Sequence, residues 1–108
     1  MNAFQVSRHP GGIWVLRLAR PERRNPLNTA TLRELRALLD RVEASPQARG
    51  VVITGSDRVF AAGADLRELA ALNPRQAEAY ARLGGEVLAR LSTFPLPVAA
   101  AVNGWALG

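Results

Sequence analysis

The sequence predicts an α/β fold, and two observations support this prediction. Residues 50–54 form a continuous run rich in β-branched side chains after a glycine, which is typical of a strand buried on both faces of a parallel sheet. This run follows a strand and a helix at the spacing of a strand–helix–strand crossover unit. The 108 residues are enough for one small domain with a single core.

The chain opens with a predicted β-hairpin. Residues 4–8 and 13–18 are short β-rich runs, and the sequence His-Pro-Gly-Gly between them is a strong turn signal. We expect His9, the single histidine, to be solvated in this turn. The apolar residues of the second run alternate, so one face of that strand should hold Trp14, Leu16 and Leu18.

A helix is predicted after the loop at residues 20–28. It should end near Ala44, because Pro46 disfavours helix at the residue before it. Its start has two rival signals, since Thr31 with Glu34 fits a capping box and Asn28 is a possible cap one turn earlier. An apolar stripe at helical spacing predicts the buried face as Leu32, Leu35, Leu38, Leu39 and Val42.

The second half predicts a short helix, a long helix and a last strand. Residues 60–64 are small and apolar, and a short helical pattern starts at Asp65. The long helix begins at a capping box of Asn73 and Gln76, runs to about residue 91 and is followed by a strand at residues 97–102. Its mid-helix pair Gly84-Gly85 would be justified by close packing against a neighbour. Its predicted buried face is Ala77, Tyr80, Gly84, Val87, Leu88 and Leu91.

Composition narrows the function classes. The absence of cysteine excludes disulfides and thiolate chemistry, and a single histidine argues against a metal site, so we predict none. The net charge of +5 comes from scattered arginines without a stripe of interleaved aromatics, which makes nucleic-acid binding a minor alternative to a solvated surface or to attraction of an anionic ligand. No secretory signal opens the chain, and residues 94–108 are too short and broken to span a bilayer. We therefore expect a cytoplasmic protein without membrane or nucleic-acid partners.

Three segments together resemble the enoyl-CoA hydratase/isomerase (crotonase) family. They are residues 20–28, residues 52–55 running into residues 60–66, and residues 97–108. The resemblance covers essentially the whole chain, and the three segments in this order are far more specific than any one of them. It implies a crotonase-like spiral of ββα turns, of which residues 1–108 would be the N-terminal part of a single domain, truncated after Gly108. It also implies a homotrimer or hexamer in the intact protein.

The shared chemistry of this family is stabilisation of a thioester enolate by two backbone N–H groups. By resemblance, the N–H of Ala64 is the first donor, and losing such a donor typically costs about 3–4 kcal/mol of barrier. The alternative is that Gly63-Ala64-Asp65 is only a turn in which Asp65 caps a helix. The two roles are compatible, and we expect the Asp65 carboxylate to be structural. The second donor would follow Gly108, and the two glutamates that a hydratase uses would lie further on.

The resemblance also implies a path for coenzyme A, as the thioester substrate rather than a permanently bound cofactor. Ala62, Ala64 and Leu66, with Asp65 between them, would lie beside the adenine. Arg24, Pro26 and Leu27 would lie along the nucleotide and pantetheine. The common family residue at Pro26 is alanine, and proline removes a backbone N–H, which puts a main-chain donor contact there in doubt. A purely structural role for residues 20–28 is the alternative.

We therefore expect acyl-CoA binding, with enoyl-CoA hydratase chemistry in the intact protein. Residues 60–66 and 101–108 look most like hydratases of phenylacetate degradation that act on 2,3-dehydroadipyl-CoA. An enoyl-CoA isomerase, an acyl-CoA hydrolase or a dihydroxynaphthoyl-CoA synthase are alternatives, as is a non-catalytic fragment or interaction module. The glutamates present fall on loops or predicted polar helix faces, so we expect none of them to act as an acid or base.

Overall fold

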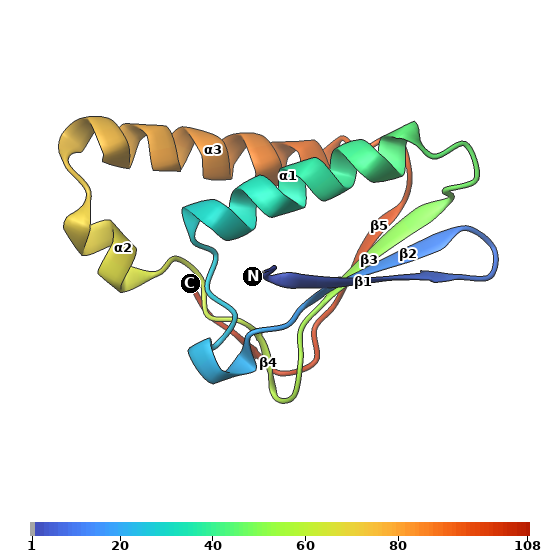
Figure 1. Ribbon diagram of the computed structural model, residues 1–108, viewed down its shortest axis with the longest axis horizontal. Coiled ribbons are helices and arrows are strands. Elements are labelled where there is room, and N and C mark those ends of the chain that lie inside the picture. Colours follow the sequence, from blue (N-terminus) through green and yellow to red (C-terminus); the bar gives the residue numbers. More distant parts are fainter. Residues whose placement is uncertain (1) are drawn as a thin grey trace.

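The computed structural model describes residues 2–108, which fold into a four-stranded sheet, a two-stranded sheet and three α-helices (Figure 1). The main sheet has the strand order β1-β2-β3-β5, in which β1 is antiparallel to β2 and the other neighbours are parallel. A separate parallel pair is formed by β4 and β6. In chain order the elements are β1 (Phe4–His9), β2 (Ile13–Leu18), a 3-10 turn (Pro21–Arg23), α1 (Thr29–Ala44), β3 (Gly50–Thr54), β4 (Val59–Ala61), α2 (Leu66–Ala71), α3 (Pro74–Ser92), β5 (Val98–Ala101) and β6 (Trp105–Ala106).

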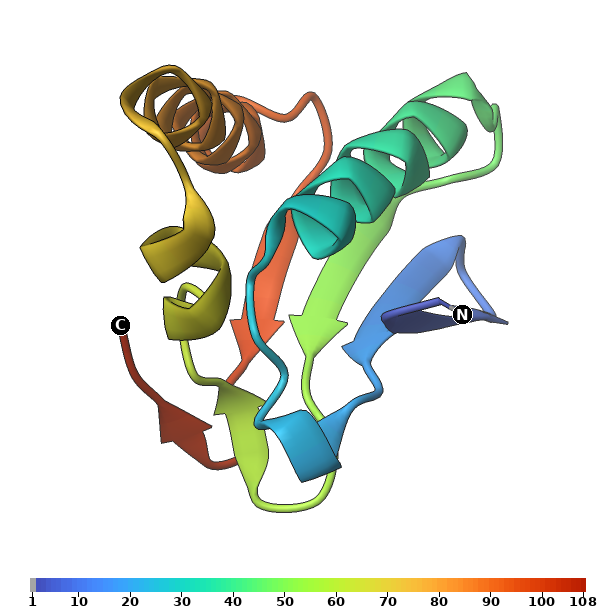
Figure 2. The same ribbon diagram turned by 60° about the vertical axis from the view of Figure 1, so that its left-hand side comes forward.

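The main sheet confirms the predicted α/β class. Strands β2 and β3 are parallel neighbours connected through α1, so β2–α1–β3 is a crossover unit of the expected kind. Both α1 and α3 lie over the same face of the sheet (Figure 2). The core lies between these layers, where Leu16 of β2 and Leu39 of α1 are fully buried and Val51 of β3 and Val87 of α3 nearly so. Burying a side chain of this size stabilises the fold by roughly 1.5–3 kcal/mol.

The start of α1 settles the choice between the two predicted caps. Asn28 is the N-cap, and its side-chain oxygen accepts a hydrogen bond of 2.8 Å from the N–H of Thr31. The predicted capping box of Thr31 with Glu34 is therefore wrong. Glu34 instead reaches the edge of the sheet, where its carboxylate accepts from the N–H groups of Ala3 at 3.0 Å and Phe4 at 2.8 Å.

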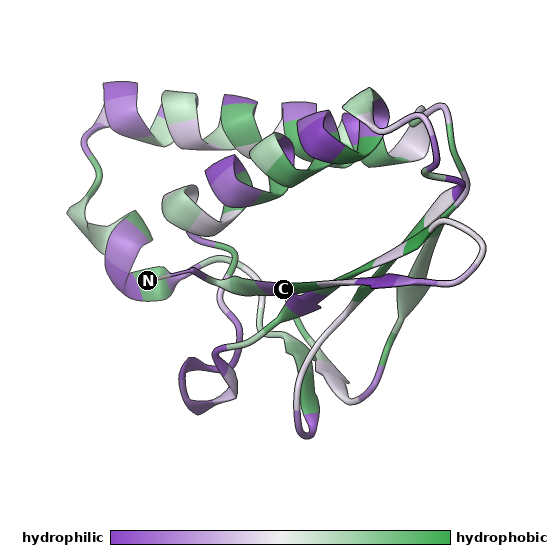
Figure 3. Cartoon of the chain, turned by 45° about the vertical axis from the view of Figure 1, so that its right-hand side comes forward, coloured by the Kyte–Doolittle hydropathy of each residue, from purple (hydrophilic) through white to green (hydrophobic). Residues whose placement is uncertain are grey.

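The long helix α3 begins as predicted but buries a different set of residues. Its capping box of Asn73 and Gln76 is present. Leu83 is buried where the sequence favoured Leu88, which is 55% exposed. Hydrophobic and hydrophilic residues alternate around both long helices (Figure 3). No helix within residues 2–108 is both long and apolar enough to cross a membrane.

The close packing that would justify the two mid-helix glycines of α3 is absent. A Cβ on Gly84 would lie 3.7 Å from Leu32 Cδ1, which is an ordinary van der Waals distance. A Cβ on Gly85 would meet nothing within 4 Å. Neither glycine is required by its surroundings, so their cost to helix stability has no packing compensation here.

Two short strands were not predicted from the sequence. Val59–Ala61 forms β4 and Trp105–Ala106 forms β6, and the two pair in parallel although more than forty residues separate them. The pair lies beside α2, at the carboxyl ends of the parallel strands β2, β3 and β5 (Figure 2). This pairing brings the last residues of the chain next to the segment that follows β4.

Candidate functional site

The loop between β2 and α1 is anchored by a buried asparagine. Asn25 is 1% exposed, and its side-chain oxygen accepts from the N–H of Arg20 at 2.7 Å. Its amide nitrogen donates to the carbonyls of Val59 and Phe60, both at 3.1 Å. Asn25 adopts a left-handed φ of 48°, which asparagine tolerates better than most residues. One side chain therefore ties the loop to β4.

The same loop pairs with the segment after β4 through the backbone. The N–H of Leu27 donates to the carbonyl of Gly63 at 2.8 Å, and the N–H of Ala62 donates to the carbonyl of Arg24 at 2.9 Å. Pro26 and Gly63 form a parallel β-bridge. The two halves of the predicted coenzyme A path are thus side by side, although their role in binding stays a prediction.

Helix α2 starts immediately after this bridge. Asp65 is its N-cap, with Oδ1 accepting from the N–H groups of Arg67 at 3.0 Å and Glu68 at 3.4 Å. The expectation that Asp65 caps a helix is confirmed. Leu66, the first residue of the helix, is 78% exposed. Among the described residues 2–108, the N–H of Ala64 has no hydrogen-bond acceptor.

The last residues of the chain lie against the same turn. The N–H of Leu107 donates to the carbonyl of Ala61 at 2.9 Å, which continues the β4–β6 pairing. Gly63 has a φ of 90°, and a Cβ added to it would lie 2.7 Å from the Cα of Gly108. Glycine is needed here both for the backbone conformation and for this close approach.

Two further contacts around the turn come from residues for which the sequence predicted other roles. Tyr80 of α3 was expected only as part of a buried face, yet its hydroxyl donates to the carbonyl of Leu27 at 2.6 Å. Glu68 of α2 was expected on a polar face, yet it accepts from the N–H of Thr29 at 3.0 Å and from its hydroxyl at 2.6 Å. Burial raises the pKa of Tyr80, and the negative charges of Glu68 and Asp65 add to the effect.

Several other carboxylates are engaged away from Ala64. Glu34 binds the start of β1, Glu78 pairs with Arg82 and Glu43 pairs with Arg90. The glutamates were predicted on loops or polar helix faces, and the sequence did not indicate that Glu34 and Glu68 are half-buried acceptors of backbone N–H groups. Within residues 2–108, no cluster of three histidine or acidic side chains is placed to hold a metal ion.

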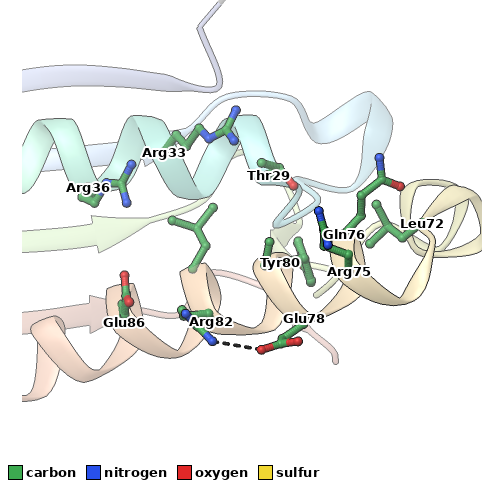
Figure 4. A pocket seen from close by; sticks show the side chains of 12 residues that line it. Thr29, Arg33, Arg36, Leu72, Arg75, Gln76, Glu78, Tyr80, Arg82 and Glu86 are labelled. Carbon is green, nitrogen blue, oxygen red and sulfur yellow. Dashed lines mark hydrogen bonds and ion pairs between the residues drawn. The ribbon is translucent and has the colours of Figure 1, made fainter.

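A groove of about 570 Å³ lies between α1 and α3 (Figure 4), and Ala64 is not among the residues that line it. Its charged lining mixes guanidinium groups with carboxylates, and one such pair, Arg82 with Glu78, is joined at 3.0 Å. Such a mixed charged surface is most simply a solvated one. Its lining residues are Thr29, Arg33, Arg36, Leu72, Arg75, Gln76, Glu78, Ala79, Tyr80, Arg82, Leu83 and Glu86.

The fold and this turn define an α/β protein in which the unpaired backbone N–H of Ala64 lies just before the capped N-terminus of α2. The sequence model of the enoyl-CoA hydratase/isomerase family matches residues 8–108. The chain therefore belongs to the enoyl-CoA hydratase/isomerase family. The family predicted from the sequence is confirmed.

Individual relatives agree with this assignment. The chain is 36% identical to the short-chain-enoyl-CoA hydratase of Clostridium acetobutylicum, over 91% of this chain and 38% of that protein. It is 41% identical to the 2,3-dehydroadipyl-CoA hydratase of Escherichia coli, over 100% of this chain and 41% of that protein. The crystal structure of an enoyl-CoA hydratase from Bacillus anthracis superposes with a TM-score of 0.92 at 31% identity, covering 99% of this chain and 42% of that one. The crotonase-like fold is confirmed, and the chain spans about two fifths of the length of these relatives.

Proposed function

We propose that this chain supplies the coenzyme A path and one oxyanion donor, the N–H of Ala64, of an enoyl-CoA hydratase. The observation that carries the proposal is the unpaired N–H of Ala64. The carbonyl of the same peptide unit, that of Gly63, already accepts a hydrogen bond from the N–H of Leu27. A donor fixed before the substrate arrives needs no reorganisation during the reaction. Membership in the hydratase/isomerase family supports the same role.

In the proposed reaction, water adds across the 2,3-double bond of an enoyl-CoA thioester. The water oxygen bonds to C3 while one of its protons leaves to a base, and negative charge moves onto the thioester oxygen. Hydrogen bonds from backbone N–H groups stabilise this charge, and C2 then takes up a proton. By the family resemblance, we assign the second donor and the acid–base groups to sequence outside residues 1–108. Within the chain, Glu34, Glu68 and Glu78 are engaged in other contacts.

We assign the coenzyme A moiety to the surface around the Pro26–Gly63 bridge. The exposed side chain of Leu66 is available to the adenine ring, and the exposed side chain of Arg24 is available to a phosphate. Ala62 and Ala64 have small side chains, which permit close approach of a ligand to the backbone. Asp65 holds the helix that carries Leu66.

The acyl group proposed first is a 2,3-dehydroadipyl chain, because a relative of that name is 41% identical over the whole of this chain. Enoyl-CoA isomerisation and acyl-CoA hydrolysis would use the same donor, since each develops negative charge on the thioester oxygen. Analysis of the reaction products of a protein that spans the full length of the hydratase relatives separates these activities. The homotrimer or hexamer implied by the resemblance and the cytoplasmic location expected from the sequence stay predictions.

The test uses acetyl-CoA labelled with ¹³C at the thioester carbonyl. Binding to the 108-residue chain should move the carbonyl resonance downfield, because a donated hydrogen bond polarises the C=O group. Ala64→Pro removes the N–H and should abolish this shift while coenzyme A still binds; Ala64→Ser keeps the N–H and should retain it. Circular dichroism of both variants verifies the fold.

Two results would overturn the proposal. One is failure of coenzyme A to bind the chain, and the other is an unchanged carbonyl shift in Ala64→Pro. Hydration of crotonyl-CoA by the 108-residue chain above background would contradict the assignment of the acid–base groups to other sequence.

A further inference from the structure

The direction of the Ala64 N–H is fixed by its own peptide unit. The carbonyl of Gly63 and the N–H of Ala64 belong to the same planar peptide, in which the two groups point in opposite directions. The carbonyl is held by the Leu27 N–H at 2.8 Å. Whatever positions Leu27 therefore sets the direction in which the Ala64 N–H points.

Leu27 is in turn held from α3. The hydroxyl of Tyr80 donates to the carbonyl of Leu27 at 2.6 Å, across 53 positions of sequence. Tyr80 faces the start of α1, where Thr29 lies opposite it (Figure 4). The backbone of Leu27 is thus bound on both sides, by Gly63 through its N–H and by Tyr80 through its carbonyl.

A second set of hydrogen bonds joins the same two segments. Glu68 lies in the first turn of α2, the helix that begins at Leu66, and it accepts from both the N–H and the hydroxyl of Thr29. The loop at residues 27–29 and the turn at residues 63–68 are therefore joined at two points. The hydrogen bond from Tyr80 to Leu27 connects these two segments to the long helix α3.

We propose that Tyr80 is a positioning residue, which aims the Ala64 N–H through Leu27 and Gly63. The inference rests on the proposed role of Ala64 as an oxyanion donor. Tyr80 itself is not assigned a contact with substrate. Burial and the nearby carboxylates of Glu68 and Asp65 raise the pKa of Tyr80, so its hydroxyl keeps the proton that it donates to Leu27.

The test is nuclear magnetic resonance of the 108-residue chain, in which Tyr80→Phe removes only the hydroxyl. We expect a smaller through-bond coupling between Leu27 ¹⁵N and Gly63 ¹³C′, a shifted Ala64 amide proton, and about tenfold faster hydrogen exchange at Leu27. The matched control is Arg90→Gln, which removes a different α3–α1 tether, to Asp40 at 2.7 Å, and should leave all three signals unchanged. Unchanged signals in Tyr80→Phe, or equal changes in Arg90→Gln, would overturn the inference.

Fluorotyrosine provides a test that does not depend on a truncated side chain. Tyr80 is the only tyrosine in the sequence, so biosynthetic incorporation changes this position alone. Fluorination makes the hydroxyl a stronger donor, and the Leu27–Gly63 coupling should then change in the direction opposite to that in Tyr80→Phe. A change in the same direction, or none, contradicts the inference.

The outcome is distinguishable from that of the proposed function. The coupling and exchange measurements need no ligand, whereas the proposed function is tested by the thioester carbonyl shift. With acetyl-CoA bound, Tyr80→Phe should reduce that shift without abolishing coenzyme A binding. If wild type shows no carbonyl shift but Tyr80→Phe alters the Ala64 amide, the donor role fails and the positioning of the peptide stands.

Discussion

Replacement of Asn25 by alanine should cost about 3–5 kcal/mol of the free energy of unfolding. The variant leaves the N–H of Arg20 and the carbonyls of Val59 and Phe60 without their present partner. An unsatisfied buried group costs about 1–3 kcal/mol, and water entering the vacated space offsets part of the sum. The left-handed φ of 48° adds roughly 1 kcal/mol for alanine. A loss of this size is a large share of the stability of a small domain.

Urea unfolding, followed by circular dichroism and tryptophan fluorescence, measures this cost. Asn25→Gly separates the two contributions, because glycine relieves the backbone strain but leaves the same groups unpaired. Asn73→Ala is the control, since it removes an exposed helix cap and should cost about 1 kcal/mol. A cost for Asn25→Ala no greater than that for Asn73→Ala would refute the view that this side chain anchors the loop.

Three further predictions follow from the same contacts. Gly85→Ala should raise stability by about 1 kcal/mol, because its Cβ meets open space; a lower thermal midpoint would contradict this. Gly63→Ala should be strongly destabilising and should weaken coenzyme A binding, because its Cβ would collide with Gly108 at a φ of 90°; calorimetry that finds wild-type affinity would count against the placement of the site. Because the pKa of Tyr80 is raised in the folded state, its contribution to stability is complete below pH about 10 and is lost as the pH rises further. Urea titrations from neutral to alkaline pH should show this fall in wild type and a flatter profile in Tyr80→Phe.

The sequence was sufficient for elements whose signals are local. The β-branched run at residues 50–54 and the capping box of Asn73 and Gln76 predicted their elements correctly, because the determining residues are close in the chain. The N-cap of α1 was ambiguous because local signals alone supported two candidates. Thr31 with Glu34 is a valid local pattern, but Glu34 finds the free N–H groups of β1, which sequence distance hides.

Contacts between distant segments escaped prediction. A strand of two or three residues, such as β4 or β6, is too short to show a period, and it forms because its partner in the fold lies parallel to it. Leu83 and Leu88 both fit an apolar stripe of α3, and the position of α1 decides which one is buried. The roles of Asn25 and Tyr80 depend on backbone groups more than thirty residues away. Asn25 did carry one usable signal, since an asparagine before a proline favours a turn.

The structure also explains how proline is accommodated at position 26. Alanine is the common residue at this position in the family that the sequence resembles, and proline removes a possible backbone donor. The bridge to the turn at Gly63 uses the N–H of Leu27 and the carbonyl of Arg24, neither of which belongs to Pro26. Proline therefore costs this bridge no hydrogen bond, and its fixed φ reduces the freedom of the loop in the unfolded chain. The candidate site depends on the backbone around Pro26, which the side chains of Asn25 and Tyr80 hold in place. Substitution of Asn25 or Tyr80 should therefore affect the site more than replacement of Pro26 by alanine.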